Sequence, residues 1–330
     1  MRTCTILSPE SATCQRSTLT RSAKHQLELE MQNMAAGLRF LPKPWRFLQS
    51  PELTEFSRLP RTAISAGRPL SSTISKTPLA EEARAENWRR RVDLAASYRI
   101  LEKYNLHEGV CNHLSIMAPA ASGDGEVMLI IPYGLHWSEV KASSFVGLNV
   151  KREVVDGEGE VDTAASTIHM GVHRTRPDAV CAFHVHPPYC TALGTLKNPR
   201  LGMYHQNACL FYNQISYDRE YSGLSTDEEE GMRTAKQLGD KSVLFMCNHG
   251  VLVVAPNAAR AMDHTYYLER ACMNQVLAMS TGQELFEIPD ELAKLVHQQL
   301  DGPGERQKFC DAHFEGMKRI LSKECPDLME

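Results

Sequence analysis

The sequence predicts a single layered α/β domain, and two observations support this prediction. Short β-type runs, rich in Val, Ile, Leu and Phe, lie at 127–131, 180–183, 243–246 and 251–254. Helical stretches separate them at 164–174, 226–238 and 257–281. Strands and helices that alternate irregularly within one body of about 250 residues are typical of one layered α/β domain.

A further helical pattern begins near Pro78, where Glu81 and Glu82 favour a helix start. Apolar residues then follow at spacings of four, which predicts a buried helical face. These residues are Trp88, Val92, Ala96 and Ile100. We expect this helix to begin the folded domain.

The net charge of −4 divides unevenly along the 330 residues. Residues 1–76 contain 11 Lys and Arg against 5 Glu and no Asp, so they carry +6 and leave −10 for residues 77–330. An acidic body with scattered cations offers no basic stripe to a phosphate backbone, so we expect no nucleic-acid partner. No run approaches about 18 consecutive apolar residues, so we expect no membrane span.

The first 76 residues have the composition of a leader. From Met34 they combine Arg39, Lys43 and Arg46 with apolar and aromatic residues, and no acid follows until Glu52. This composition indicates a mitochondrial presequence. The alternatives are a disordered extension that is not cleaved, and an upstream start codon that is not used. We therefore expect a basic leader at 1–76, the folded domain at 77–290 and a C-terminal helical extension at 291–330, in a mitochondrial or cytoplasmic protein.

The ten cysteines are dispersed and form no Cys-x-x-Cys pair. Several lie in apolar stretches, where a reduced thiol packs as a small hydrophobe. These are Cys181, Cys209, Cys247 and Cys272. The pattern favours a reducing, intracellular compartment and indicates no structural zinc ribbon.

Three histidines have the spacing of metal ligands. His184 and His186 follow a β-type run, and positions i and i+2 of a strand share a face, so both rings can reach one ion at about 2 Å. The alternative is a solvated strand face. His249 lies 63 residues later in an apolar stretch, before Gly250, where the backbone can kink between two strands.

A lone buried histidine is more often a core residue than a ligand. Three neutral imidazoles with an open position, however, are typical of a catalytic zinc site. We predict a divalent metal on His184, His186 and His249, zinc first, with iron or manganese also permitted by imidazole ligands. The prediction requires their ring nitrogens to converge within about 4 Å of a common point.

Four segments, together with the β-type run that leads to His184 and His186, resemble the class II aldolase and adducin head family. The match runs in the same order along the chain, from about residue 90 to residue 285. The four segments are 108–115, 129–143, 168–178 and 248–250. The resemblance implies an αβα fold around a central, largely antiparallel sheet and a homotetramer with active sites between subunits. It also implies zinc on the histidines that match His184, His186 and His249.

The resemblance also implies a lyase. A divalent ion can chelate the hydroxy-carbonyl unit of a small, sugar-derived substrate and stabilise the enediolate formed when a carbon–carbon bond breaks. The resemblance implies that two segments contact that substrate, the loop at 108–115 and the Pro-x-Gly turn. Their residues are Asn112, His113, Ser115, Pro132, Tyr133 and Gly134.

One family position departs from the pattern. The aldolases carry their proton-transferring Glu four residues before the histidine that matches His169, and that position here is Ala165. One of two phosphate-binding hydroxyls is lost beside it, so we expect a retro-aldol or decarboxylation substrate without a phosphate.

Other residues can supply the acid or base. His205 and Tyr212 lie in the segment from which a neighbouring aldolase subunit contributes a tyrosine; the alternative is an interface strand whose aromatic rings only pack. Glu139 is better explained as a helix cap. His136 and Trp137 either line a pocket or lie in a surface loop.

Three functions follow. The first is a metal-dependent lyase or decarboxylase. The second is a non-catalytic adducin-like module that binds actin or another protein, although the Lys-rich tail of animal adducins is not present before Glu330. The third is oxidative chemistry at iron in the same pocket. We favour the enzyme, because packing alone gives little reason for three metal-type histidines in family register.

Overall fold

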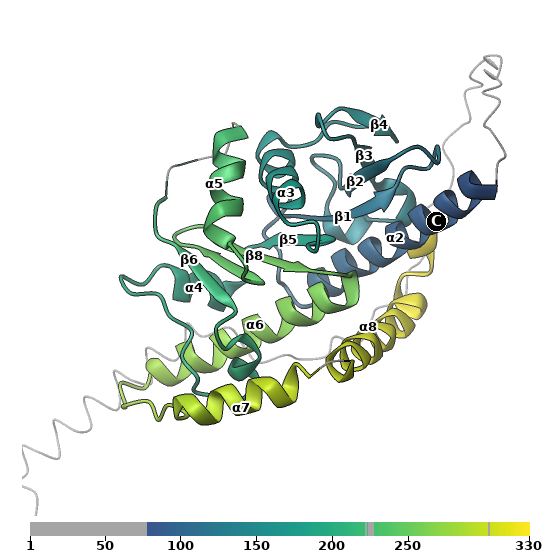
Figure 1. Ribbon diagram of the computed structural model, residues 1–330. Coiled ribbons are helices and arrows are strands. Elements are labelled where there is room, and N and C mark those ends of the chain that lie inside the picture. Colours follow the sequence, from purple (N-terminus) through teal and green to yellow (C-terminus); the bar gives the residue numbers. More distant parts are fainter. Residues whose placement is uncertain (1–77, 222, 224–227, 303) are drawn as a thin grey trace, which may run out of the picture. The chain divides into compact units, whose positions relative to one another are not determined.

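An eight-stranded sheet forms the centre of the structure, a computed structural model that describes residues 78–330 except 222, 224–227 and 303 (Figure 1). The leader with its presequence pattern lies outside the described residues. Among the helices of the described part, none combines the length and apolar character needed to cross a membrane.

The sheet is mixed but mostly antiparallel. Its strands are β1 (His113–Pro119), β2 (Glu126–Ile130), β3 (Val146–Leu148), β4 (Val154–Asp156), β5 (Cys181–Val185), β6 (Ile215–Asp218), β7 (Val243–Met246) and β8 (Gly250–Ala255). Their order is β4-β3-β2-β1-β5-β8-β7-β6, and β6 with β7 is the parallel pair among them. The four β-type runs of the sequence correspond to β2, β5, β7 and β8.

Seven α-helices and four short 3₁₀ helices are described. The α-helices are α2 (Pro78–Lys103), α3 (Thr163–Thr175), α4 (Pro188–Gly194), α5 (Glu228–Leu238), α6 (Ala258–Met279), α7 (Asp290–Leu300) and α8 (Glu305–Glu324). The 3₁₀ helices are η2 (Trp137–Glu139), η3 (Ala142–Ser144), η4 (Gln206–Phe211) and η5 (Pro326–Met329).

Alternating side chains divide the sheet into two buried faces. On β5, Cys181, Phe183 and Val185 join the large core that contains residues of α2 and α6. Ala182, between them, joins the cluster under α3 and α5. A strand that is apolar on both faces needs a layer on each side. The structure thus confirms the αβα arrangement with a mostly antiparallel sheet (Figure 1).

The helices α3 and α5 touch backbone to backbone at a pair of glycines. A Cβ on Gly171 would lie 2.6 Å from the carbonyl oxygen of Gly231, well inside contact distance. A side chain at Gly231 would likewise meet the carbonyl of Thr167. This close contact holds α3 against α5.

The predicted first helix is present as α2, but its buried face is shifted from the predicted one. Trp88 is 44% exposed and Val92 is half-buried, whereas Ala96 and Ile100 are fully buried. Arg91 is buried instead, because its guanidinium donates to the Phe145 carbonyl oxygen and pairs with Asp156 of β4, both at 2.7 Å. The buried guanidinium of Arg91 has hydrogen-bond partners and a counter-charge, so it can be buried. It lies on the buried face of α2, where the spacing predicted the apolar residues Trp88 and Val92.

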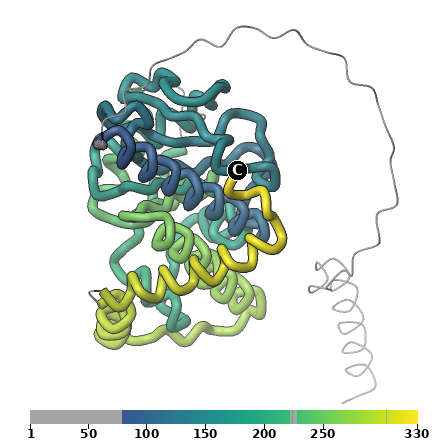
Figure 2. The backbone as a smooth tube through the Cα atoms, turned by 90° about the vertical axis from the view of Figure 1, so that its right-hand side faces the viewer, coloured from purple at the N-terminus to yellow at the C-terminus, as the bar shows by residue number. Residues whose placement is uncertain are grey.

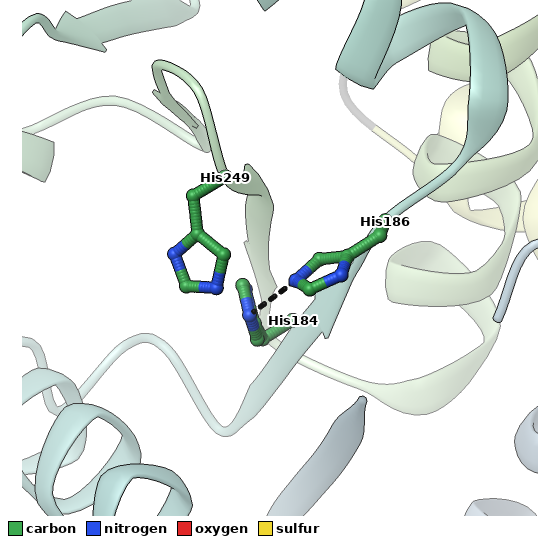
Figure 3. A group of neighbouring side chains, drawn as sticks. All are labelled: His184, His186 and His249. Atoms are coloured by element: carbon green, nitrogen blue, oxygen red, sulfur yellow. Dashed lines mark hydrogen bonds between the residues drawn. The ribbon is translucent and has the colours of Figure 1, made fainter. Parts of the chain in front are cut away.

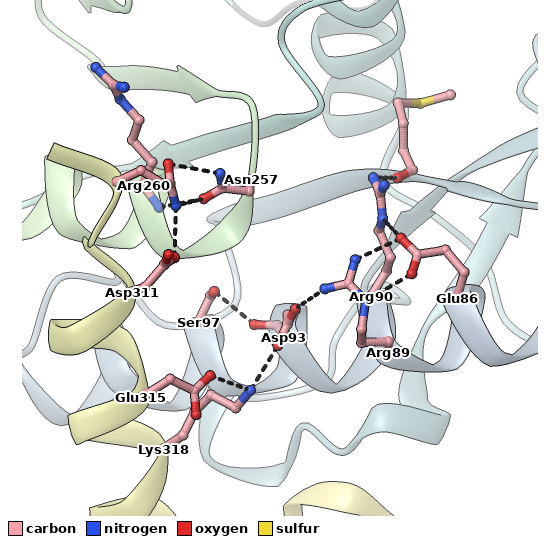
Figure 4. Close-up of polar contacts among 12 residues, drawn as sticks. Glu86, Arg89, Arg90, Asp93, Ser97, Asn257, Arg260, Asp311, Glu315 and Lys318 are labelled. Atoms are coloured by element: carbon pink, nitrogen blue, oxygen red, sulfur yellow. Dashed lines mark hydrogen bonds and ion pairs between the residues drawn. The ribbon is translucent and has the colours of Figure 1, made fainter. Parts of the chain in front are cut away.

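The C-terminal helix α8 packs on α2 and α6, and Figure 2 shows α8 beside α2. Figure 4 shows Lys318 of α8 reaching Asp93 of α2 at 3.0 Å and Glu315 of its own helix at 3.0 Å. The chain then ends against η3, where the Ser143 amide donates to the Glu330 carbonyl oxygen at 2.8 Å. Residues 291–330 therefore contribute contacts to the same body as α2.

The four cysteines singled out in apolar stretches, Cys181, Cys209, Cys247 and Cys272, are all buried and free. They pack as small hydrophobes, as the sequence indicated.

Candidate metal centre

Three imidazoles converge where β5 meets the turn between β7 and β8. His184 lies on β5, His186 just beyond its end, and His249 in the turn (Figure 3). Because β5 and β8 are neighbours, the turn brings His249 over the other two rings. One nitrogen from each lies within 4.8 Å of the others, so they have a common point inside the limit of about 4 Å. We call these residues the histidine triad.

Hydrogen bonds at the outer nitrogens turn the Nε2 atoms of two rings toward each other. Nδ1 of His184 donates to the Val251 carbonyl oxygen at 3.1 Å, and Nδ1 of His186 donates to a carboxylate oxygen of Glu108 at 2.6 Å. In neutral rings both Nε2 atoms are then bare, and they lie 3.2 Å apart. At this distance either a proton or a metal ion must lie between the two nitrogens.

The geometry of the triad suits such a cation. Tetrahedral zinc with Zn–N bonds of about 2.0–2.1 Å separates its nitrogen ligands by roughly 3.3 Å. Burial, followed by the neighbouring histidines, holds the pKa of His184 well below its usual range. Burial, together with His186, lowers the pKa of His249 to about 4. Both rings are therefore neutral near pH 7, which is the form that binds a metal ion.

The turn that carries His249 differs from the predicted kink. The chain reverses at Asn248, whose φ of 62° is left-handed, while Gly250 already pairs with Met246 as the first residue of β8. A Cβ on Gly250 would meet the His186 ring and would lie 2.7 Å from the Val185 carbonyl oxygen. The glycine is therefore required by the close approach of β5 rather than by backbone freedom.

Glu108 is a member of this site that the sequence did not reveal, because it precedes β1 by several residues and carries no metal-ligand spacing. Its carboxylate is exposed and orients His186. A carboxylate that holds the outer nitrogen of a ligating histidine fixes both tautomer and ring direction.

We expect Glu108→Ala to weaken divalent metal binding by about 10- to 100-fold, because His186 loses its orienting partner. Titration of the metal-free protein with Zn²⁺ in competition with a chromophoric chelator measures this. Glu108→Gln is the matched control, since its amide oxygen still accepts from Nδ1, and it should retain most of the affinity. Equal affinities for Glu108→Ala and the wild type would show that Glu108 does not orient the ligand.

A line of hydrogen-bonded side chains lies behind the triad, between the sheet and α3. Nδ1 of His113 and Nε2 of His169 are 2.8 Å apart, and Nδ1 of His169 lies 2.5 Å from the Ser115 hydroxyl. That hydroxyl lies 2.7 Å from Nε2 of His173, whose Nδ1 donates to the Ala179 carbonyl oxygen at 2.7 Å. All four side chains are buried. We call His113, His169, Ser115 and His173 the imidazole chain.

The imidazole chain includes two residues that were predicted to contact substrate, Ser115 and His113, and the two occupy different positions relative to the triad. Ser115 is completely buried and shared by two rings, so it lies behind His113, inside the protein. His113 stands opposite His184 in the pairing of β1 with β5, and the two ring centres are 4.9 Å apart. His113 therefore borders the triad, whereas Ser115 supports it.

Burial makes the stability of the protein sensitive to acid. It lowers the pKa of His113 to about 3, of His173 to about 4 and of His264 to about 3. An unfolded histidine titrates near about 6.5, so below that pH the unfolded state binds more protons. We expect stability to be complete above about pH 6.5 and to fall as the pH drops toward 4.

Urea unfolding of the metal-free protein at pH 7.5 and pH 5.0 measures this effect. The expected loss at pH 5.0 is about 2 kcal/mol or more, since each depressed pKa contributes up to about 1.4 kcal/mol per pH unit. Equal unfolding free energies at the two pH values would contradict the burial of neutral histidines.

Asn112, also predicted to contact substrate, offers a free donor. Its side-chain oxygen accepts from the Glu108 amide at 2.7 Å, and its carbonyl oxygen accepts from the Trp137 indole at 3.3 Å. The side-chain Nδ2 is buried and has no partner. A buried donor without a partner is costly, which favours a ligand oxygen beside it.

The predicted turn Pro132, Tyr133 and Gly134 follows β2. Gly134 has a φ of 86°, and Tyr133 is 67% exposed. Among the described contacts, none joins this turn to the triad. Trp137 does not lie in a surface loop, because it is fully buried and packs edge-on against Tyr98 at 4.6 Å.

Glu139 is a helix cap, as the sequence indicated. Its carboxylate accepts from the amide of His136 at 3.2 Å, and the His136 side chain in turn accepts from Ser138. These bonds form a capping box at η2.

Among the described contacts, none joins His205 or Tyr212 to the triad within one chain. They flank η4, so the predicted interface strand is a 3₁₀ helix. His205 is exposed and caps η4, and the Tyr212 hydroxyl donates to Asp290 at 2.9 Å. Tyr212 lines a cavity of about 530 Å³ together with residues that include Asp290, the first residue of α7, and the hydrogen bond to Asp290 raises the pKa of Tyr212.

Ala165 lies in an apolar cluster of β2, β3 and α3 with Met128, Ile130 and Val146. We expect Ala165→Glu to lower the unfolding free energy by about 2–4 kcal/mol, because a carboxyl group is buried there without a partner. Urea unfolding measures this, with Ala165→Met as the apolar control. A stable Ala165→Glu variant would indicate that this position opens to the metal centre.

Comparison with known proteins places this site in a family. A model described as the Class II Aldolase and Adducin N-terminal domain matches residues 92–276. A Caulobacter vibrioides protein, provisionally named as a class 2 aldolase, is 34% identical over 208 residues, which cover 63% of this chain and 79% of that protein. Alpha-adducin of Rattus norvegicus is 33% identical over 196 residues, which cover 58% of this chain and 26% of the adducin.

Solved structures show the same fold. An aldolase II superfamily protein from Pseudomonas syringae has a TM-score of 0.67 at 29% identity, over 74% of this chain and 96% of that chain. L-fuculose 1-phosphate aldolase from Glaciozyma antarctica has a TM-score of 0.64 at 22% identity, over 78% of this chain and 96% of that chain. The chain therefore belongs to the class II aldolase and adducin N-terminal domain family.

Proposed function

We propose that this protein is a metal-dependent lyase that cleaves a carbon–carbon bond, by retro-aldol reaction or decarboxylation, in a small hydroxy-carbonyl compound. The convergence of His184, His186 and His249, whose ligand nitrogens lie within 4.8 Å of one another, carries the proposal. We propose zinc as the ion, because its nitrogen spacing fits and imidazole is among its preferred ligands. Iron and manganese remain the alternative ions.

A divalent ion at the triad would polarise a carbonyl oxygen and stabilise negative charge as the adjacent bond breaks. The protein's own groups orient the substrate. Nδ2 of Asn112 is available to donate to a substrate oxygen, and Glu108 holds His186 in the tautomer that faces inward. Ala165 leaves no carboxyl group at the family's proton-transfer position.

We propose that the proton donor comes from a neighbouring subunit of a homotetramer, where His205 and Tyr212 would reach the triad of another copy. The exposure of His205 and the cavity beside Tyr212 support this. Light scattering at the concentration of the activity assay tests it. A monomer with full activity would contradict this part of the proposal.

The experiment for the proposed function has two parts. Metal analysis of the purified protein should give about one divalent ion per chain. The metal-loaded protein is then incubated with a set of hydroxy-ketones, keto-acids and their phosphorylated counterparts, and released aldehyde or carbon dioxide is measured. Turnover that disappears with a chelator and returns with Zn²⁺ is expected, first with compounds that lack a phosphate. Turnover unchanged by metal removal would refute the proposal.

The second candidate is a non-catalytic module that binds actin or another protein. The likeness to alpha-adducin and the presence of Ala165 favour it. Co-sedimentation with actin filaments discriminates the two functions. Binding that persists after metal removal, with no turnover of any compound in the set, would support the module.

A further inference from the structure

The direction of the hydrogen bonds in the imidazole chain is determined at its far end. The Ala179 carbonyl oxygen can only accept, so Nδ1 of His173 carries the proton and Nε2 of the neutral ring is bare. This bare nitrogen accepts the proton of the Ser115 hydroxyl. Because a hydroxyl has one proton to give, its oxygen must accept from Nδ1 of His169.

The same reasoning extends to His113. With its proton on Nδ1, neutral His169 presents a bare Nε2, which accepts from Nδ1 of His113 at 2.8 Å. Neutral His113 therefore has a bare Nε2. The three rings are neutral because they are buried and, among the described residues, none is bonded to a carboxylate, so an imidazolium there would lack compensation.

The bare nitrogen belongs to a ring that borders the triad. His113 faces His184 across the β1–β5 pairing, on the sheet face that α3 covers. The ring centre of His113 lies 4.9 Å from that of His184, and the rings of His186 and His249 lie 4.9 Å and 4.7 Å from His184 on their side. The described structure gives Nε2 of His113 no hydrogen bond, so its lone pair is available to a ligand.

We propose that His113 accepts a hydrogen bond from a hydroxyl group of the compound bound at the triad, and that Ser115, His169 and His173 are positioning residues that hold His113 in its accepting tautomer. This inference rests on the proposed metal-dependent function. It predicts selectivity for a substrate that presents an O–H at this point. An O-methyl analogue has no proton to give and would leave the lone pair unsatisfied.

The tautomer is measurable without metal or substrate. In the full chain labelled with ¹⁵N-histidine, long-range ¹H–¹⁵N correlation spectra distinguish a protonated Nδ1 from a protonated Nε2, and His113→Phe assigns the signal. We expect His113 to carry its proton on Nδ1. A proton on Nε2 would overturn the proposal, since that ring could only donate toward the triad.

Ligand binding gives the second test. Calorimetry on the zinc-loaded protein compares glycolate with methoxyacetate, which lacks the hydroxyl proton. The ratio of the affinity for glycolate to that for methoxyacetate should be about three- to tenfold higher in the wild type than in His113→Phe. This is the effect expected from one neutral hydrogen bond. Ser115→Ala should reduce the preference toward that of His113→Phe, and Ser115→Thr, which keeps the hydroxyl, should restore it.

The outcomes separate this inference from the proposed function. An unchanged preference in a folded Ser115→Ala variant would overturn the role of the imidazole chain while leaving the metal centre intact. A wild-type protein that binds no divalent ion would overturn the proposed function, and the ligand contact of His113 with it. A normal metal content together with an Nε2–H tautomer would overturn the role of His113 alone.

Discussion

The His184→Ala variant is expected to lose the metal ion almost completely, with at least about a 100-fold loss of affinity, a larger effect than removal of an orienting partner. The rings of His186 and His249 lie 4.9 Å and 4.7 Å from that of His184, and His184 is the fully buried member of the triad. With alanine at this position only two histidine ligands remain, and they bind a divalent ion much more weakly than three do. Metal analysis after dialysis measures the loss.

Stability gives an independent measure of the same change. An ion at 100 times its Kd stabilises the folded protein by about 2.7 kcal/mol, and a variant that does not bind it gains nothing. Zn²⁺ should therefore raise the Tm of the wild type and leave that of His184→Ala unchanged. His136→Ala, in the exposed cap of η2, is the matched control and should keep its metal. Wild-type metal content in His184→Ala would refute the site.

The Asp263→Ala variant is expected to lower the unfolding free energy by about 3–5 kcal/mol, because it leaves a buried arginine without its counter-charge. Asp263 of α6 is completely buried, pairs with Arg306 of α8 and accepts from Nδ1 of His313 at 2.8 Å. No pattern in the sequence indicated this cluster, because Arg306 and His313 lie 43 and 50 residues after Asp263.

Urea unfolding of Asp263→Ala, beside Glu305→Ala, measures the cost. Glu305 pairs with Lys308 on the exposed side of α8, so its removal should have no measurable effect. A double variant, Asp263→Ala with Arg306→Met, should recover part of the loss, since the uncompensated charge is then gone. A small change in Asp263→Ala would mean that α8 contributes little to the folded body.

Patterns within one element predicted much of the fold. The i, i+2 spacing of His184 and His186 places both rings on one strand face, and the apolar runs mark the central strands. By contrast, β3 and β4 have three residues each, too few to show a periodic pattern. Arg91 was missed because its burial depends on Asp156, 65 residues away.

In the candidate site, too, local spacing was predictable and long-range contacts were not. Three histidines could be paired from their spacing and from the family resemblance, but the roles of Glu108 and Ser115 depend on how β1 pairs with β5. That register brings Ser115 under α3 and places His113 against His184. A single sequence does not contain this information, because long-range pairing is set by the whole sheet.

The place of β5 in the sheet has a consequence for the order in which the protein assembles. Strands β1 to β4 can pair as soon as they leave the ribosome, and β5 then adds to the free edge of β1. The other edge of β5 stays open until β8 is made, 65 residues later. A nascent chain at that stage carries His184 and His186 without His249, so an ion held by all three histidines could bind only once the turn between β7 and β8 has been made, with α6 to α8 still to follow.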